Sequence, residues 1–380
     1  MAFDAGMLAC TLAELRALAL GARIEKVYQP ERDEILLQMR SLEGGKRLLI
    51  NAGSNNPRIG FTTAQKENPQ NPPMFCMLLR KYLQGAKLSE ITQADFDRIA
   101  FLGFDTRDEM GFSCRRYLIA ELMGKYSNLI FADENKKIIT ALRTTDFSLD
   151  SVRQLLPGMT YALPPSQNKT NPLHVTREEF FSLWAAEPAE RRCDKFLVDR
   201  FCGVAPVVAR EIVFLSTGHT DTPLRYCFVD EIWTHFSAVM TRIRESNFAP
   251  SLILDGDAAV EFSFLPLSQY GSMECRAIAN AGQLLDQYFE TRDHAQRVHQ
   301  RAADILRLLT NAEARIRKKL ELQRGELRDC EQGGEYKKCG DLITANSYRL
   351  SRGDTTATFD DYETMDETGN FAQVTVTRDP

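Results

Sequence analysis

The stretch PPMFCMLLRKYLQGAKL, residues 72–88, sets the pattern for the first half of this chain. We expect a helix from 74 to 84, because the missing N–H of Pro73 costs little at a helix start and Gly85 suits a helix end. Its body is almost entirely apolar, which predicts burial on nearly all sides. Arg80 and Lys81 break the apolar run near the C-terminal end, where cations suit the helix dipole. The segment predicts a rigid element that presents positive charge to an anion, or more simply a core helix whose cations reach solvent.

Short strands surround this helix along the chain. Alternating or β-branched runs bounded by turn residues indicate strands at 23–29, 34–39, 46–52, 98–104, 114–122, 128–132 and 137–141. A second helix is expected at about 8–20, packed with the first on the sheet. Strands and helices arranged in this way predict an α+β fold.

A segment rich in Pro, Ser and Asn, residues 157–172, predicts a linker to a helical region at 175–248. Thr176 is the expected N-cap of the first of these helices. Gly203 and Pro206 then resemble the turn of a helix-hairpin-helix, whose exposed N–H groups can hold a phosphate. Gly203, Val204 and Ala205 are therefore candidate phosphate ligands, although an ordinary helix–helix turn explains the same residues.

The last part of the chain predicts strands within 251–280 and then a long helix at about 281–331 that Gly333 and Gly334 end. Apolar residues recur along this helix at steps of three and four, as in a coiled coil. They are Ala295, Val298, Ala302, Ile305, Leu309, Ala312 and Ile316. One helix cannot bury this seam alone, so we expect a second arm or self-association of the chain. Residues 335–350 are expected to be helical and 351–380 acidic and strand-like.

Composition limits the functional classes. The 380 residues are 43% apolar and 26% charged with a net charge of −5, as in soluble globular proteins. We expect no transmembrane helix and no signal peptide, and therefore a cytoplasmic protein. Nine scattered cysteines and five histidines show no metal-ligand spacing, so we expect no metal and no disulfide framework. Nucleotide-binding and catalytic motifs are also missing, which predicts no catalytic residues and no cofactor.

Asp95, Asp97 and Arg98 form the most suggestive polar group. On the expected strand, Asp97 and Arg98 point to opposite faces and need not neutralise each other. Arg98 can clamp a phosphate or stack on a base, and Asp97 can accept a hydrogen bond from a base amino group. The two aspartates could instead bind Mg²⁺, or simply cap a turn and pair with Arg98.

Four segments together resemble the NFACT family: residues 72–88, 1–6, 93–99 and 121–130. The resemblance implies an NFACT-N domain at 1–170, similar to the N-terminal fold of formamidopyrimidine-DNA glycosylase. It implies a helix-hairpin-helix domain at 171–250, and short strands with a first coiled-coil arm at 251–350. Residues 351–380 would then begin a middle domain at the tip of the coil.

The same resemblance implies a ribosome quality-control factor rather than an enzyme. Such a protein binds a large ribosomal subunit obstructed by peptidyl-tRNA and recruits alanyl-tRNA for template-free alanine tailing, with peptidyl transfer left to the subunit. Asp4, Asp97 and Arg98 match family positions implicated in tRNA recognition. Lys125, next to the stacking ring of Tyr126, is a further candidate tRNA contact. The remaining candidates for tRNA binding are Arg80 and Lys81.

Two rival functions belong to other classes. An older family name implies a surface adhesin that binds fibronectin, which the lack of a signal peptide and the free cysteines disfavour. A glycosylase of the related fold needs a proline nucleophile after Met1, a neighbouring glutamate and usually a zinc finger. Ala2 and Phe3 occupy those positions, which disfavours that enzyme.

Overall fold

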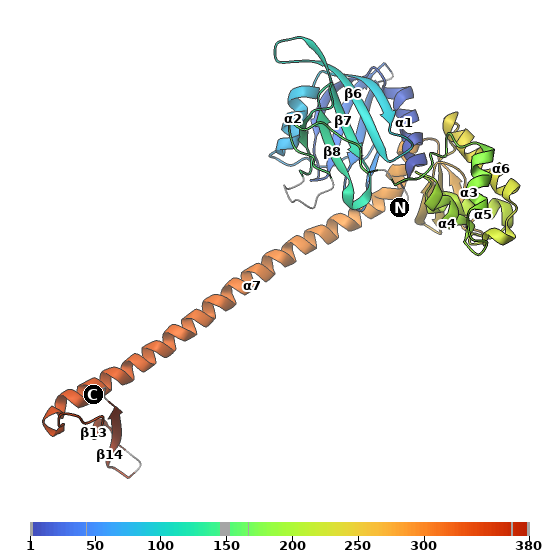
Figure 1. The fold of residues 1–380 in the computed structure, drawn as a ribbon. Helices are drawn as coiled ribbons and strands as arrows, with labels where there is room; N and C mark the ends of the chain where they lie inside the picture. Colours follow the sequence, from blue (N-terminus) through green and yellow to red (C-terminus); the bar gives the residue numbers. More distant parts are fainter. Residues whose placement is uncertain (1–2, 43, 145–152, 166, 366–367, 378–380) are drawn as a thin grey trace. The chain divides into compact units, whose positions relative to one another are not determined.

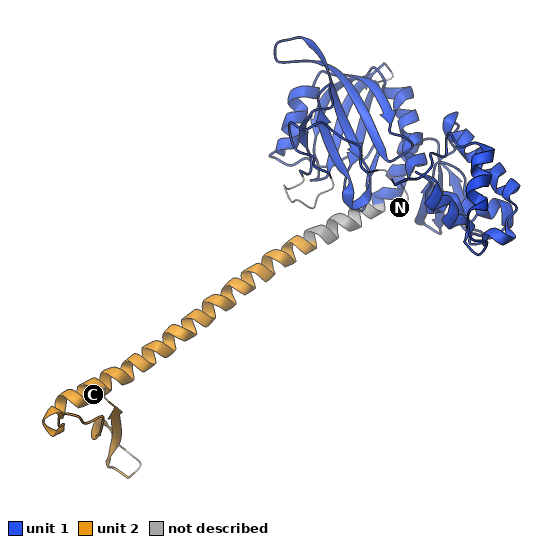
Figure 2. Cartoon of the chain, in the orientation of Figure 1, with its two compact units in different colours: residues 1–295 blue, residues 296–380 orange. Residues whose placement is uncertain are grey.

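The computed structural model describes residues 3–42, 44–144, 153–165, 167–365 and 368–377, with the backbone alone for 291–301. The chain forms two compact units, Met1–Ala295 and Gln296–Pro380 (Figure 2). Each unit is described by itself.

A nine-stranded antiparallel sheet forms the frame of the first unit (Figure 1). Its spatial order is β4-β3-β2-β1-β5-β6-β7-β8-β9, so consecutive strands are neighbours except where β1 pairs with β5. The strands are β1 (Arg23–Tyr28), β2 (Glu34–Ser41), β3 (Gly44–Asn51), β4 (Arg58–Phe61), β5 (Lys87–Gln93), β6 (Ile99–Arg107), β7 (Ser113–Glu121), β8 (Asn128–Ala132) and β9 (Ile138–Ala141). A 3₁₀ turn, η1 (Gly124–Tyr126), links β7 to β8. The expected strands and the hairpin at 128–141 are thus present, which confirms these predictions.

Helix α1 (Ala5–Ala19) is mostly buried against this sheet. It packs on β2, β4 and β5, although β4 and β5 are far apart in the strand order. The sheet must therefore curl around α1. At the start of the helix, a Cβ on Gly6 would lie 2.2 Å from the ring of Phe264, so only glycine permits this close approach.

Helix α2 (Met74–Leu83) packs on β1 and β6 and has only one buried face. Phe75, Cys76 and Leu79 are buried, whereas the side chains of Met74 and Met77 are 75% and 50% exposed. The prediction of burial on nearly all sides is therefore wrong. The apolar run counted methionines as core residues, but their positions along the helix place them on its outer face.

Four helices follow the linker: α3 (Arg177–Ala185), α4 (Cys193–Arg200), α5 (Pro206–Thr217) and α6 (Val229–Arg244), with the 3₁₀ turn η2 (Leu224–Tyr226) before α6. Thr176 caps α3 in a capping box with Glu179, which confirms the predicted N-cap. The core of this region is aromatic. The ring of Phe180 lies within 6.5 Å of six other aromatic rings: Phe181, Trp184, Phe196, Phe201, Trp233 and Phe236.

A small sheet joins the helical region to the rest of the first unit. Its order is β11-β10-β12, with β10 (Ser251–Asp255), β11 (Ala258–Ser263) and β12 (Glu274–Ala277). The buried carboxylate of Glu211 on α5 accepts hydrogen bonds from the backbone N–H groups of Ser268 and Gln269 at 2.7 and 3.0 Å. These bonds fix α5 to the segment that follows β11.

Helix α7 runs from Ala281 to Ala345 without a break at Gly333 or Gly334, so the predicted helix end there is wrong. Glycine lowers helix propensity by only about 1 kcal/mol, which the flanking helix formers outweigh. In the second unit the last turns of α7 pack on the hairpin of β13 (Thr356–Met365) and β14 (Phe371–Thr377), with the 3₁₀ turn η3 (Ser347–Arg349) between them. The core in the described part of this unit is small, and its buried apolar residues are Leu342, Phe359 and Val376.

Candidate functional site

Asp95, Asp97 and Arg98 lie on a tight loop, not on a strand. Residues 94–98 connect β5 to β6, and Asp95 and Phe96 have φ values of 37° and 55°. The expectation that Asp95, Asp97 and Arg98 begin a strand is wrong for this reason. Asp97 closes the loop, since its N–H donates to the carbonyl of Ala94 and its carboxylate accepts the N–H of Arg98 at 2.7 Å.

The turn between α4 and α5 holds this loop in its unusual conformation. Gly203 has φ +71°, and a Cβ there would lie 2.3 Å from the carbonyl oxygen of Phe96 and 2.8 Å from the Cβ of Ala5. Cys202 adds a bond from its thiol to the carbonyl of Asp95, at 3.7 Å. Burial, followed by the charge of Asp97, raises the pKa of the Cys202 thiol, so this cysteine stays neutral.

Asp4, at the start of α1, lies near the same loop and turn. Its carboxylate accepts the N–H of Met7 at 2.7 Å and so caps the helix. Burial raises the pKa of Asp4 to about 7, against the opposing effects of the Met7 bond and the Arg98 charge. The amide of Gln93 ties the helix to the loop, because it donates to the carbonyls of both Ala5 and Asp97, at 3.0 and 2.9 Å.

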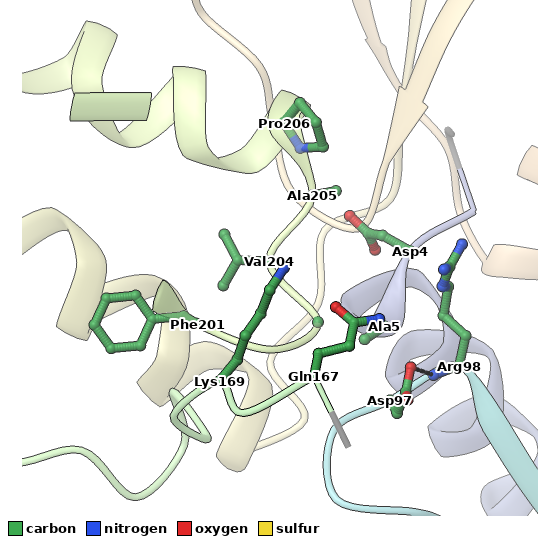
Figure 3. Close-up of a pocket in the computed structure, with 11 residues that line it drawn as sticks. Asp4, Ala5, Asp97, Arg98, Gln167, Lys169, Phe201, Val204, Ala205 and Pro206 are labelled. Carbon is green, nitrogen blue, oxygen red and sulfur yellow. Dashed lines mark hydrogen bonds between the residues drawn. The ribbon is translucent and has the colours of Figure 1, made fainter. Parts of the chain in front are cut away.

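These three segments and the linker enclose a pocket of about 220 Å³ (Figure 3). It is lined by Asp4, Ala5, Asp97, Arg98, Gln167, Lys169, Phe201, Gly203, Val204, Ala205 and Pro206. Figure 3 shows Asp4 and Arg98 beside the start of α1, with Lys169 across from them toward the α4–α5 turn. Lys169 is held there by a bond from Nζ to the carbonyl of Val198, at 2.9 Å.

The pocket unites six of the nine candidate residues from the sequence: Asp4, Asp97, Arg98, Gly203, Val204 and Ala205. Arg80, Lys81 and Lys125 are not among its lining residues. Arg80 donates to the carbonyl of Val27 at 2.8 Å, Lys81 pairs with Glu109 at 2.6 Å, and Lys125 lies over the ring of Tyr126.

Gln167 and Lys169 are the polar lining residues that sequence reasoning missed. Their segment has the composition of a linker, which gives no sign that its side chains face a pocket. The sequence therefore carries no signal that could have suggested them.

Chemically, the pocket offers carboxylate acceptors, cationic donors and a turn of backbone N–H groups. Within the described ranges, the N–H groups of Gly203, Val204 and Ala205 donate to no other group of the protein. Among the described residues, no group of three or more His, Cys, Asp or Glu side chains could hold a metal ion. No helix in those ranges combines the length and apolar character needed to cross a lipid bilayer.

A family model for the NFACT N-terminal and middle domains matches residues 4–380. The chain belongs to the NFACT family. Among curated relatives, it is 33% identical to Rqc2 homolog RqcH of Streptococcus suis, over 97% of this chain and 62% of that protein. It is 31% identical to Rqc2 homolog RqcH of Bacillus subtilis, over 93% of this chain and 60% of that protein. This NFACT chain thus spans about 60% of the length of these relatives.

The match extends to eukaryotes over a shorter region. The mouse protein named ribosome quality control complex subunit NEMF is 30% identical over 148 residues, or 38% of this chain and 13% of that protein.

Solved structures of NFACT proteins share the fold. The N-terminal part of the fibronectin/fibrinogen-binding protein from Streptococcus suis has a TM-score of 0.64 at 33% identity, covering 76% of this chain and 99% of that one. The fibrinogen binding protein from Staphylococcus aureus gives the same TM-score and coverage at 28% identity. The binding that these names state belongs to those proteins. MutM (Fpg) from Thermus thermophilus reaches a TM-score of only 0.25, so the expected likeness to the glycosylase fold stays a prediction.

Proposed function

We propose that this chain is the tRNA-holding part of a cytoplasmic ribosome quality-control factor. In this proposal the protein binds an obstructed large ribosomal subunit that carries peptidyl-tRNA and recruits tRNA, alanyl-tRNA by family resemblance, for C-terminal tailing of the stalled chain. Peptidyl transfer is left to the subunit. The names of the relatives support the quality-control role. One observation supports the site: Asp4, Asp97 and Arg98 come from distant segments to line one pocket.

The chemistry of the pocket suits an RNA loop. The guanidinium of Arg98 can bind a phosphate or stack on an unpaired base, and the carboxylate of Asp97 can accept from a base amino group. The N–H groups of Gly203, Val204 and Ala205 form a turn that can bind a phosphate oxygen, as backbone turns do in other phosphate sites. On this basis we propose that the α4–α5 turn is the hairpin of a helix-hairpin-helix and binds a phosphate.

Recovery of tRNA with the purified protein tests the proposal. Wild-type protein and the double variant Asp97→Ala/Arg98→Ala are purified from cells under identical conditions, and the bound RNA is sequenced. We expect wild-type protein to enrich one tRNA family. The amount of that tRNA recovered with the double variant should be lower by at least about tenfold, because charged hydrogen bonds are removed.

The matched control is Asp105→Ala/Arg115→Ala, which removes another Asp–Arg pair, 2.8 Å apart and largely exposed on β6 and β7. Its tRNA recovery should equal that of wild-type protein, and thermal melting should be similar for all three proteins. Undiminished tRNA in the Asp97→Ala/Arg98→Ala sample would disprove the site assignment. A large drop in melting temperature for that variant alone would show that the pair is structural.

A further inference from the structure

A second pocket of about 360 Å³ adjoins the first. The two pockets share four lining residues, Asp97, Gln167, Lys169 and Gly203, and therefore form one cleft with two compartments. The second compartment lies between the 94–98 loop, the linker and the α4–α5 turn. Its own lining residues are Ala94, Asp95, Ile99, Leu163, Pro164, Pro165, Asn171 and Cys202.

Apolar side chains line part of the second compartment. Leu163, Pro164 and Pro165 come from the linker, and Ile99, only 1% exposed, comes from the start of β6. Leu163 is 47% exposed. The proline rings restrict the backbone φ at 164 and 165, which stiffens this segment. Apolar side chains of this kind can pack on the face of a planar ring.

The compartment is also lined by polar residues. The carboxylate of Asp95 accepts no hydrogen bond from any described residue, while its backbone is fixed by the bond from Cys202. Asn171 uses its carbonyl oxygen to accept the N–H of Leu173 at 3.0 Å, which leaves its amide N–H groups to donate. Apolar lining residues together with a carboxylate and an amide complement a nucleobase, and the carboxylate favours a base with an exocyclic amino group over uracil.

We propose that the second compartment binds the nucleobase next to the one in the first pocket, as a subsite for an amino-bearing base of single-stranded RNA. This inference rests on the proposed function, since it takes the first pocket to hold RNA. Lys169 lines both compartments, so its ammonium can contact the phosphate that joins the two nucleotides, while Asp97 keeps its contact with the base in the first pocket. Asp95 then determines base preference, and Leu163 contributes affinity whatever the base.

Short RNA probes test the subsite on the whole chain. The probes are labelled hexamers of uridine with no, one or two adjacent central cytidines, and binding is followed by fluorescence anisotropy at low salt. Wild-type protein should bind the two-cytidine hexamer several-fold more tightly than the one-cytidine hexamer, because two subsites are filled. Asp95→Asn, which keeps the size of the side chain and tolerates positive φ, should bind the two hexamers equally.

Controls separate this inference from the proposed function. Asp257→Asn makes the same charge change at an exposed turn and should keep the wild-type preference. Leu163→Ala should weaken all hexamers by a similar factor. Asp97→Ala/Arg98→Ala should lose binding of every hexamer; if it does not, or if wild-type protein binds none, the proposed function fails and this inference with it.

Two results would overturn the subsite alone. One is an Asp95→Asn protein that still prefers two cytidines over one to the wild-type extent. The other is that free cytidine monophosphate competes for the protein as well as the unlabelled two-cytidine hexamer does. The compartment would then be a mononucleotide site instead of part of an RNA cleft.

Discussion

Gly203 and Phe96 show how single residues shape the site. The carbonyl of Phe96 occupies the space that a Cβ at position 203 would need, and both residues have positive φ. A non-glycine residue at positive φ costs about 1 kcal/mol or more, so the loop keeps Phe96 in this conformation only because packing demands it. The position of Asp97 and Arg98 thus depends on a glycine about a hundred residues away.

Replacing this glycine should therefore cost more than backbone strain alone. We expect Gly203→Ala to lower the free energy of unfolding by roughly 2–5 kcal/mol, from positive φ plus overpacking. The control Gly218→Ala has nearly the same φ of +73° but nothing within 4 Å of its Cβ, so it should cost only about 1–2 kcal/mol. Urea unfolding of both variants measures the difference. If both variants lose the same free energy of unfolding, the 94–98 loop moves to make room for the methyl group at position 203.

Asp4 should make stability depend on pH. Burial raises its pKa from 3.8 to about 7 in the folded state, so ionisation is less favourable there than in the unfolded chain. Its contribution to stability is full below about pH 4 and is lost as pH rises through 7, by up to roughly 4 kcal/mol. Asp4→Asn keeps an oxygen for the helix cap and cannot ionise. The free energy of unfolding of wild-type protein, relative to that of Asp4→Asn, should therefore fall between pH 4.5 and 8 in urea titrations. If the two proteins change in stability with pH in the same way, the raised pKa of Asp4 is contradicted.

At the scale of elements, helix α7 exposes the seam that the sequence predicts. Ile305, Leu309 and Ile316 are 57%, 61% and 67% exposed, and Ala302 and Ala312 are exposed between them. Ala295 and Val298 fall where side chains are outside the described part. Burying apolar surface is worth about 25 cal/mol per Å², so this stripe is a strong candidate for pairing. The coiled coil itself stays a prediction.

We expect the chain to self-associate through this seam as its concentration rises, and Ile305→Asp to abolish the association. The matched control Leu306→Asp puts the same charge one residue away, at a side chain 63% exposed, and should change the association much less. Light scattering over a dilution series measures both. Four cations near the seam, Arg315, Arg317, Lys318 and Lys319, favour an antiparallel pair. A wild-type chain that is monomeric at every concentration would disprove the prediction.

For the whole molecule, sequence predicts best where the signals are local. The cap at Thr176, the turn at Gly203 and the start of α5 at Pro206 each depend on neighbouring residues, and all are present. The αL conformation of Asp95 and Phe96 could not be foreseen, because contacts with the α4–α5 turn impose it. The pocket was predicted only as separate residues, and family resemblance linked Asp4 to Asp97. Their meeting depends on the packing of α1 on β5, at whose end the amide of Gln93 bonds the carbonyls of both Ala5 and Asp97.

The two compact units should also differ in stability. Among its described residues, the second unit has three buried apolar side chains, which form a small core. Phe359, 3% exposed, should cost roughly 3–5 kcal/mol when changed to alanine, enough to unfold so small a core. We expect fast amide exchange across β13 and β14 in Phe359→Ala, with exchange in β1–β9 unchanged. The control Tyr348→Ala, at a side chain 81% exposed, should leave both units protected; slow exchange in both variants would contradict a separate, weak unit.

The position of Asp4 has a practical consequence for handling the protein. Asp4 lines the pocket, and its neighbour Phe3 is buried. An extended chain covers at most about 3.6 Å per residue, so an affinity tag joined within a few residues of Asp4 stays close to the pocket. A basic or histidine-rich tag there would compete with RNA for the carboxylates of Asp4 and Asp97. Purification handles are therefore better placed away from Asp4, and any binding study made with a tag close to this residue should be repeated after the tag is removed.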